Sequence, residues 1–127
     1  MTKLKILHVE DDLDIQEIAK LSLETIGGFE VLQCASGKQA LAEVLEFAPD
    51  LFLLDMMMPE MSGDEVLKNL RELPGLQDTP AIFMTARAQR KEIVDLKSLG
   101  AIEVILKPFD PMTLPDQIKT AVSMAQK

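Results

Sequence analysis

Charged or hydroxyl side chains come directly after four short apolar stretches of this 127-residue sequence. They are Glu10 with Asp11, then Asp55, Thr85 and Lys107. Two carboxylates about 4 Å apart repel by roughly 4 kcal/mol at an effective dielectric constant of about 20. If Glu10, Asp11 and Asp55 converge they therefore need a cation, and hard oxygen ligands favour Mg²⁺ over zinc.

A carboxylate held against Mg²⁺ can act as a nucleophile toward phosphorus, as in aspartyl-phosphate chemistry. The transferred group spreads its charge over three oxygens. The cation can bind one oxygen, the Lys107 amine a second and the Thr85 hydroxyl a third. We therefore predict that Asp55 accepts a phosphoryl group, a prediction that fails if Asp55→Asn protein still becomes phosphorylated at that position.

These side chains can meet only if the apolar stretches form one parallel sheet. The expected strands are 4–9, 29–35, 51–55, 81–84 and 102–106. The third and fourth are wholly apolar before their ends, which is typical of the centre of a parallel sheet, and the second and fifth are the most polar and are expected at its edges. Only the stretch at 29–35 ends without a chemically useful side chain.

Helical patterns follow each expected strand, with cap residues Asp12, Ser36, Ser62 and Thr113. The helix expected at about 89–99 has a thin apolar stripe, which predicts weak packing. The residues expected to face the core are Ile15, Ile18, Ala19, Ser22, Ile26, Ala40, Leu41, Val44, Leu45, Ala48, Val66, Leu70, Leu73, Ile93, Leu96, Leu99, Leu114, Ile118, Ala121 and Ala125. Alternating strands and helices predict a doubly wound α/β fold with five parallel strands and five helices, forming one domain over 1–127.

Composition excludes several classes of protein. The formal net charge is −8 and Lys and Arg form no cluster, which argues against direct nucleic-acid binding. No signal peptide or apolar run of membrane-spanning length is present, and a single cysteine, Cys34, permits no internal disulfide. We expect a cytoplasmic protein with Cys34 buried as apolar filler, and His8 as a buried or edge-of-core residue instead of a ligand.

The chain resembles the receiver domain of two-component response regulators over essentially its whole length. The resemblance is carried by four motifs in the right order: Val9-Glu10-Asp11-Asp12, Leu54-Asp55-Met56-Met57-Met58-Pro59, Met84-Thr85-Ala86 and Lys107-Pro108-Phe109. In size the chain is close to the stand-alone chemotaxis type. The resemblance implies a flavodoxin-like sheet with strand order 2-1-3-4-5.

The resemblance also implies a metal site and a phosphorylation site. Asp55 corresponds to the phosphorylated aspartate. Asp11 and Asp55 would bind Mg²⁺ directly, Glu10 would act through water, and the backbone carbonyl of Met57 would be a further ligand. Met57 and Arg87 occupy the two positions whose side chains tune the lifetime of the phosphate in the family.

A second set of roles concerns signalling. The phosphate-binding and switch residues implied by the resemblance are Thr85, Ala86 and Lys107. The family's usual switch aromatic lies three residues before the lysine, and that position holds Val104. We expect the signal to pass through a smaller packing change at Val104 and the helix at 89–99, which an unchanged helix surface by NMR after activation would refute.

The implied function is that of a single-domain response regulator. A histidine kinase or phosphotransfer protein would donate the phosphoryl group, and a protein partner would read the changed surface formed by the last two helices and the strand between them. The same surface would serve a phosphorylation-linked homodimer. Because the chain ends with its last helix, we expect no attached output domain.

Three other functions fit the sequence less well. A Mg²⁺-dependent phosphohydrolase needs a second acid two residues after its nucleophile, where this chain has Met57, so we expect no enzyme beyond self-phosphorylation and dephosphorylation. A nucleotide-binding flavodoxin-like module is disfavoured because the acidic turn at 10–14 repels phosphate. A docking domain without phosphorylation is disfavoured because no site residue is missing.

Overall fold

A computed structural model describes residues 3–87 and 89–125 of the chain. Five parallel strands form one sheet in the order β2-β1-β3-β4-β5. The strands are β1 (Lys5–Val9), β2 (Glu30–Cys34), β3 (Leu51–Asp55), β4 (Ala81–Thr85) and β5 (Ala101–Leu106). The predicted fold and strand order are confirmed, with β3 at the centre and β2 and β5 at the edges.

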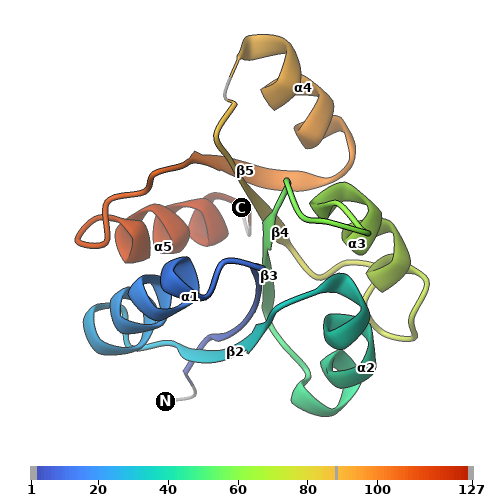
Figure 1. The fold of residues 1–127 in the computed structure, drawn as a ribbon, viewed down its shortest axis with the longest axis horizontal. Helices are drawn as coiled ribbons and strands as arrows, with labels where there is room; N and C mark the ends of the chain where they lie inside the picture. Colours follow the sequence, from blue (N-terminus) through green and yellow to red (C-terminus); the bar gives the residue numbers. More distant parts are fainter. Residues whose placement is uncertain (1–2, 88, 126–127) are drawn as a thin grey trace.

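Helices cover both faces of the sheet, with α1 and α5 on one face and α2 and α3 on the other, while α4 lies beyond them beside β5 (Figure 1). The helices are α1 (Leu13–Lys20), its π-helical continuation η1 (Leu21–Ile26), α2 (Gly37–Phe47), α3 (Gly63–Arg71), α4 (Arg90–Ser98) and α5 (Leu114–Ala125). None of the helices in the described ranges has the length and apolarity to cross a membrane.

Two apolar clusters lie on the two faces of the sheet. Alternate residues of each buried strand contribute to opposite clusters: Leu7 and Val9 of β1 belong to one, Ile6 to the other. All five residues of β3 and all five of β4 are buried, as expected for central strands of a parallel sheet. The sheet therefore has a rigid centre that ends in Asp55 and Thr85.

Side chains at the helix starts fix where the loops end. Asp12 caps α1 by accepting the backbone N–H of Asp14 at 2.9 Å. Before α3, the Glu65 carboxylate accepts the backbone N–H of Ser62 at 3.1 Å, as in the predicted capping box. These caps determine the direction in which the chain leaves the carboxyl edge of the sheet, which is the edge formed by the carboxyl ends of the strands.

Several residues expected to face the core are exposed instead. They are Ile18, Ile26, Leu45, Ala48, Leu99 and Ala125. The expected face assumed 3.6 residues per turn, but Leu21–Ile26 is a π-helix with a wider turn, so Leu23 is buried and Ile26 points outward. Ala48 and Leu99 follow the last turns of α2 and α4 as C-cap residues, where the chain leaves the helix.

Candidate functional site

The carboxyl edge of the sheet gathers three acidic side chains from two neighbouring strands. Glu10 and Asp11 follow β1, Asp55 ends β3, and Val9 pairs with Leu54 in the parallel register. Carboxylate oxygens of the three acids lie within 4.8 Å of one another. Glu10 and Asp55 are buried, whereas Asp11 is exposed at the surface of the cluster.

Lys107 reaches this cluster from the end of β5. Its Nζ lies 3.0 Å from Glu10 Oε1 and 3.1 Å from Asp55 Oδ1, so one ammonium group pairs with both buried acids. The backbone N–H of Lys107 donates to the Thr85 carbonyl at 2.8 Å, and the Lys107–Pro108 peptide bond is cis. Lys107 is thus held by the end of β4 while its side chain spans to β1 and β3.

Burial and pairing shift the ionisation of this cluster. Loss of hydration raises the pKa of Glu10 to about 7, although the hydrogen bond from Lys107 opposes the shift and the charge of Asp55 adds to it. Burial alone would lower the pKa of Lys107, but its hydrogen bonds to Glu10 and Asp55 outweigh burial and raise it. Lys107 therefore stays charged near neutral pH, while Glu10 titrates there.

The chemistry of the donor set fits a hard divalent cation. When all three acids are ionised they carry −3, and the +1 of Lys107 leaves −2 for the cluster. Carboxylate oxygens are the ligands that Mg²⁺ and Ca²⁺ prefer, and in the described part of the chain no thiol or imidazole belongs to this group. The acidic cluster could therefore bind a metal.

Thr85 ends β4 beside the acidic cluster, where it is buried and its Oγ1 accepts the backbone N–H of Arg87 at 3.1 Å. A cavity of about 330 Å³ is bordered by Thr85, Arg87, Met56 and Met57 and by residues of α4. The side chains of Ala86, Arg87 and Met57 are exposed. The switch hydroxyl implied by the sequence thus lies between the acidic cluster and α4.

Val104 is half-buried in β5 and packs against the apolar cluster that also contains Leu96 of α4. Within α4, which the structure describes completely, Leu96 is the single buried residue, whereas α3 buries four. The thin stripe in the sequence therefore predicted the weak packing of α4 correctly, although Leu99 is 53% exposed.

Gly63 supports Asp55 in a way the sequence analysis missed. A Cβ atom at position 63 would lie 2.4 Å from the Asp55 carbonyl oxygen, so the first turn of α3 can approach β3 only without a side chain. The Gly63 N–H donates to the Met56 carbonyl at 3.1 Å. The available signal was the glycine directly after the cap residue Ser62.

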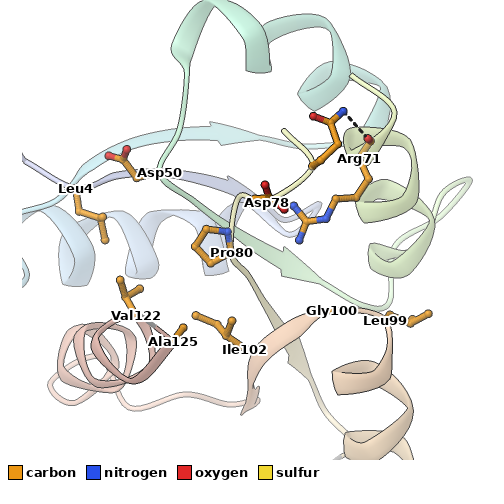
Figure 2. A pocket seen from close by; sticks show the side chains of 11 residues that line it. Leu4, Asp50, Arg71, Asp78, Pro80, Leu99, Gly100, Ile102, Val122 and Ala125 are labelled. Carbon is orange, nitrogen blue, oxygen red and sulfur yellow. Dashed lines mark hydrogen bonds between the residues drawn. The ribbon is translucent and has the colours of Figure 1, made fainter. Parts of the chain in front are cut away.

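A cavity of about 720 Å³ lies at the opposite edge of the sheet. Figure 2 shows Leu4 and Asp50 on one side of it, Pro80 at its centre and Arg71 on the other side. The Arg71 guanidinium donates to the Leu76 carbonyl at 2.8 Å and so ties down the loop before β4. None of the residues expected to do chemistry lines this cavity.

The sequence matches the family described as response regulator receiver domain over residues 6–119. The chain belongs to this family. It is 40% identical over 115 residues to the transcriptional regulatory protein CpxR of Klebsiella pneumoniae, covering 91% of this chain and 47% of that protein. The phosphate regulon regulatory protein PhoB of Pseudomonas aeruginosa is 34% identical over 117 residues, or 92% of this chain and 51% of that protein.

Solved receiver structures share the fold of this receiver domain. The chemotaxis protein CheY4 of Vibrio cholerae is 30% identical with a TM-score of 0.87, over 94% of this chain and 99% of that one. A CheY-like receiver domain protein of Methanospirillum hungatei is 30% identical with a TM-score of 0.84, over 98% of both chains. The chain spans about half the length of the curated relatives it matches. Receiver domains are signalling domains of two-component systems.

Proposed function

We propose that this receiver domain accepts a phosphoryl group on Asp55 from a histidine kinase or a phosphotransfer protein, in a Mg²⁺-dependent step. The observation that carries the proposal is the position of the Asp55 carboxylate within 4.8 Å of Glu10 and Asp11 and 3.1 Å from Lys107. A buried nucleophile between an acidic cation site and a fixed ammonium group suits phosphoryl transfer, in which positioning and charge stabilisation supply most of the catalysis.

In the proposed step an Asp55 carboxylate oxygen attacks phosphorus of a phosphohistidine. A P–O bond forms, the P–N bond breaks, and the electron pair stays with the imidazole nitrogen of the donor. Lys107 exchanges its contact with the Asp55 oxygen for one with a phosphoryl oxygen, and the Thr85 hydroxyl binds another. The backbone of Ala86, which directly follows Thr85, would also contact the phosphoryl group.

The cation-binding residues in this proposal are Asp11 and Asp55, the backbone carbonyl of Met57, and Glu10 through water. Bound Mg²⁺ would supply positive charge that neutralises the carboxylates and the transferred phosphoryl oxygens. The exposed side chains of Met57 and Arg87 border the same cavity as Thr85, which supports a role in setting how fast water reaches the phosphoryl group. We place the domain in the cytoplasm, in keeping with its buried free Cys34.

Signalling follows from a shift between two states of the surface formed by α4, β5 and α5. When Thr85 turns toward the phosphoryl group it gives up its contact with the Arg87 backbone, which loosens the loop that leads into α4. Val104 of β5 packs against the apolar cluster that contains Leu96, and we propose that this contact transmits the change without an aromatic side chain. A protein partner, or a second phosphorylated copy, would read the altered surface.

The test is intact-mass measurement after incubation with acetyl phosphate, with and without Mg²⁺. Wild-type protein should gain a single phosphate adduct only with Mg²⁺, and Asp55→Asn should gain none. Asp50→Asn is the matched control, because Asp50 is exposed at the opposite edge of the sheet and should leave the adduct unchanged. An adduct on Asp55→Asn, or sustained phosphate release from small phosphoesters, would contradict the proposal.

A further inference from the structure

A chain of polar side chains lies beneath the acidic turn and is not part of the acidic cluster. On adjacent strands, His8 and Gln33 are direct partners in the register of β1 and β2. The Gln33 side-chain amide donates to His8 Nδ1 at 3.1 Å and to the backbone carbonyl of Gln16 at 2.7 Å. The Gln16 side-chain amide in turn donates to the Glu10 carbonyl at 2.6 Å. These hydrogen bonds link edge strand β2 to the acidic turn at 10–14.

The imidazole of His8 is fully buried and neutral. Nδ1 faces the donating amide nitrogen of Gln33 and therefore carries no proton, which leaves the ring neutral. Because Nδ1 accepts from Gln33, the proton lies on Nε2, which has no hydrogen-bond partner among the described residues. A buried donor without a partner destabilises a fold, so an apolar residue would serve stability better at this position. What the imidazole contributes is an acceptor that fixes the Gln33 amide.

The Glu10 carbonyl belongs to the peptide that joins Glu10 to Asp11. Asp11 is exposed, and in residues 3–87 and 89–125 its carboxylate takes part in no hydrogen bond, so its direction depends on this peptide. A hydrogen bond from Gln16 at 2.6 Å restricts rotation of that peptide. Side chains that orient metal ligands from outside the ligand set often change affinity strongly when they are removed.

We propose that Gln16, Gln33 and His8 form a positioning relay that holds the Glu10–Asp11 peptide in the orientation that binds a divalent cation. The relay rests on the proposed function, because it serves the Mg²⁺ site of that proposal. It assigns a role to β2, whose end carries no chemically useful side chain, and to a histidine that neither binds metal nor takes part in phosphoryl transfer. These three are positioning residues, since each acts through another.

The experiment replaces each glutamine by methionine, which keeps the length of the side chain and removes its amide. Mg²⁺ affinity is measured by isothermal titration calorimetry with MgCl₂, because the chain has neither Trp nor Tyr to report binding by fluorescence. We expect Gln16→Met to raise the Mg²⁺ dissociation constant about tenfold and Gln33→Met about threefold, as the distance from Glu10 grows. His8→Leu should have a smaller effect in the same direction, and His8→Gln, which restores an acceptor, should reverse it.

A second measurement separates positioning from simple loss of stability. The rate of phosphorylation by acetyl phosphate is followed as a function of Mg²⁺ concentration. In the relay variants the half-saturating concentration should rise while the maximal rate stays within about twofold, the pattern of lost ground-state binding. Gln77→Met is the matched control, because the Gln77 side-chain amide donates to the Leu73 backbone carbonyl at 2.7 Å at the opposite edge of the sheet and should change neither value.

The outcomes distinguish the relay from the proposed function. If wild-type protein binds no Mg²⁺ and is not phosphorylated, both proposals fail. If wild type behaves as proposed and folded Gln16→Met and Gln33→Met match it, or Gln77→Met shifts as much as they do, the relay alone is wrong. In wild type the side-chain amide protons of Gln16 and Gln33 should exchange slowly by NMR, and fast exchange would overturn the relay even if a variant failed to fold.

Discussion

The two halves of the carboxyl edge are held in different ways. The acidic half, made of Glu10, Asp11, Asp55 and Lys107, is fixed by ion pairs of 3.0 and 3.1 Å and by strands buried on both faces. In the switch half, made of Thr85 and its loop to α4, the Thr85 hydroxyl has one hydrogen bond among the described residues, of 3.1 Å from the Arg87 backbone, and the loop leads to a helix with a single buried residue.

This difference is what the proposed phosphoryl transfer and the proposed signalling would each require of the edge. Phosphoryl transfer needs groups held in fixed positions, because small displacements weaken the stabilisation of the transition state. A signal needs an element that moves at low cost, and such elements have few buried apolar contacts. The sequence places the two requirements on different strands, with β1, β3 and β5 carrying the fixed groups and β4 leading into the weakly packed helix α4.

Lys107→Met is the strongest test of the acidic half. It leaves Glu10 and Asp55 buried beside each other without a cation. We therefore expect the free energy of unfolding at pH 8 without metal to be about 3 kcal/mol lower than that of wild type. Urea denaturation measures the loss, and Mg²⁺ should recover part of it. Lys97→Met, which removes an exposed pair with Glu103 at 3.8 Å, should stay within about 0.5 kcal/mol. Equal losses in the two variants would show that the acidic half is no better held than the surface.

Gly63→Ala tests how closely α3 must approach Asp55. The new Cβ would lie 2.4 Å from the Asp55 carbonyl oxygen, and neither the backbone of β3 nor that of α3 can move aside easily. We expect a loss of about 2 kcal/mol in stability together with slower phosphorylation by acetyl phosphate. Gly75→Ala lies in an open loop with φ +80° and should lose stability by backbone strain while its phosphorylation rate stays unchanged. A wild-type rate in Gly63→Ala would contradict this view of the site.

His8, two residues before Glu10, makes the free energy of unfolding depend on pH in a way that can be measured separately. Its pKa is about 3 in the folded state and about 6.5 when unfolded, so its contribution to stability is complete above pH 6.5 and is lost as pH falls toward 3. Glu10, with a raised pKa of about 7, acts oppositely, since stability falls as pH rises from its unfolded pKa to about 7.

The difference between wild type and His8→Leu should therefore change by about 1 kcal/mol between pH 6 and pH 5, with wild type losing more stability on acidification. Urea denaturation at the two pH values measures it. Parallel curves for the two proteins would mean that the imidazole is not buried as a neutral group.

The fold and the acidic residues of the site could be predicted because they depend on short-range patterns. Apolar stretches followed by Glu10, Asp55 or Lys107 identify strand ends, and parallel strands bring their carboxyl ends to one edge whatever the loops between them. The burial of His8 and Cys34 followed from the same patterns and is confirmed. The roles of the site residues remain predictions until phosphorylation is measured.

Other features depend on register and on local helix geometry, which the pattern of apolar residues does not determine. The bond between Gln33 and His8 exists only because β1 and β2 pair in that register. The outward position of Ile26 depends on a π-helical turn, and a periodicity of 3.6 residues cannot reveal it. The double pairing of Lys107 likewise depends on how far its side chain reaches across β4.

The switch half should show the smallest energetic effect and the clearest change in structure. We expect acetyl phosphate with Mg²⁺ to shift the NMR amide signals of α4 while those of α3 stay in place, because Leu96 alone anchors α4 and four residues anchor α3. Val104→Ala removes packing between β5 and the apolar cluster that contains Leu96. It should lower the free energy of unfolding by no more than about 1 kcal/mol, yet reduce the shift of the α4 signals. Equal shifts in α3 and α4 would mean that the whole carboxyl edge moves as one body, and the contrast between its two halves would then be wrong.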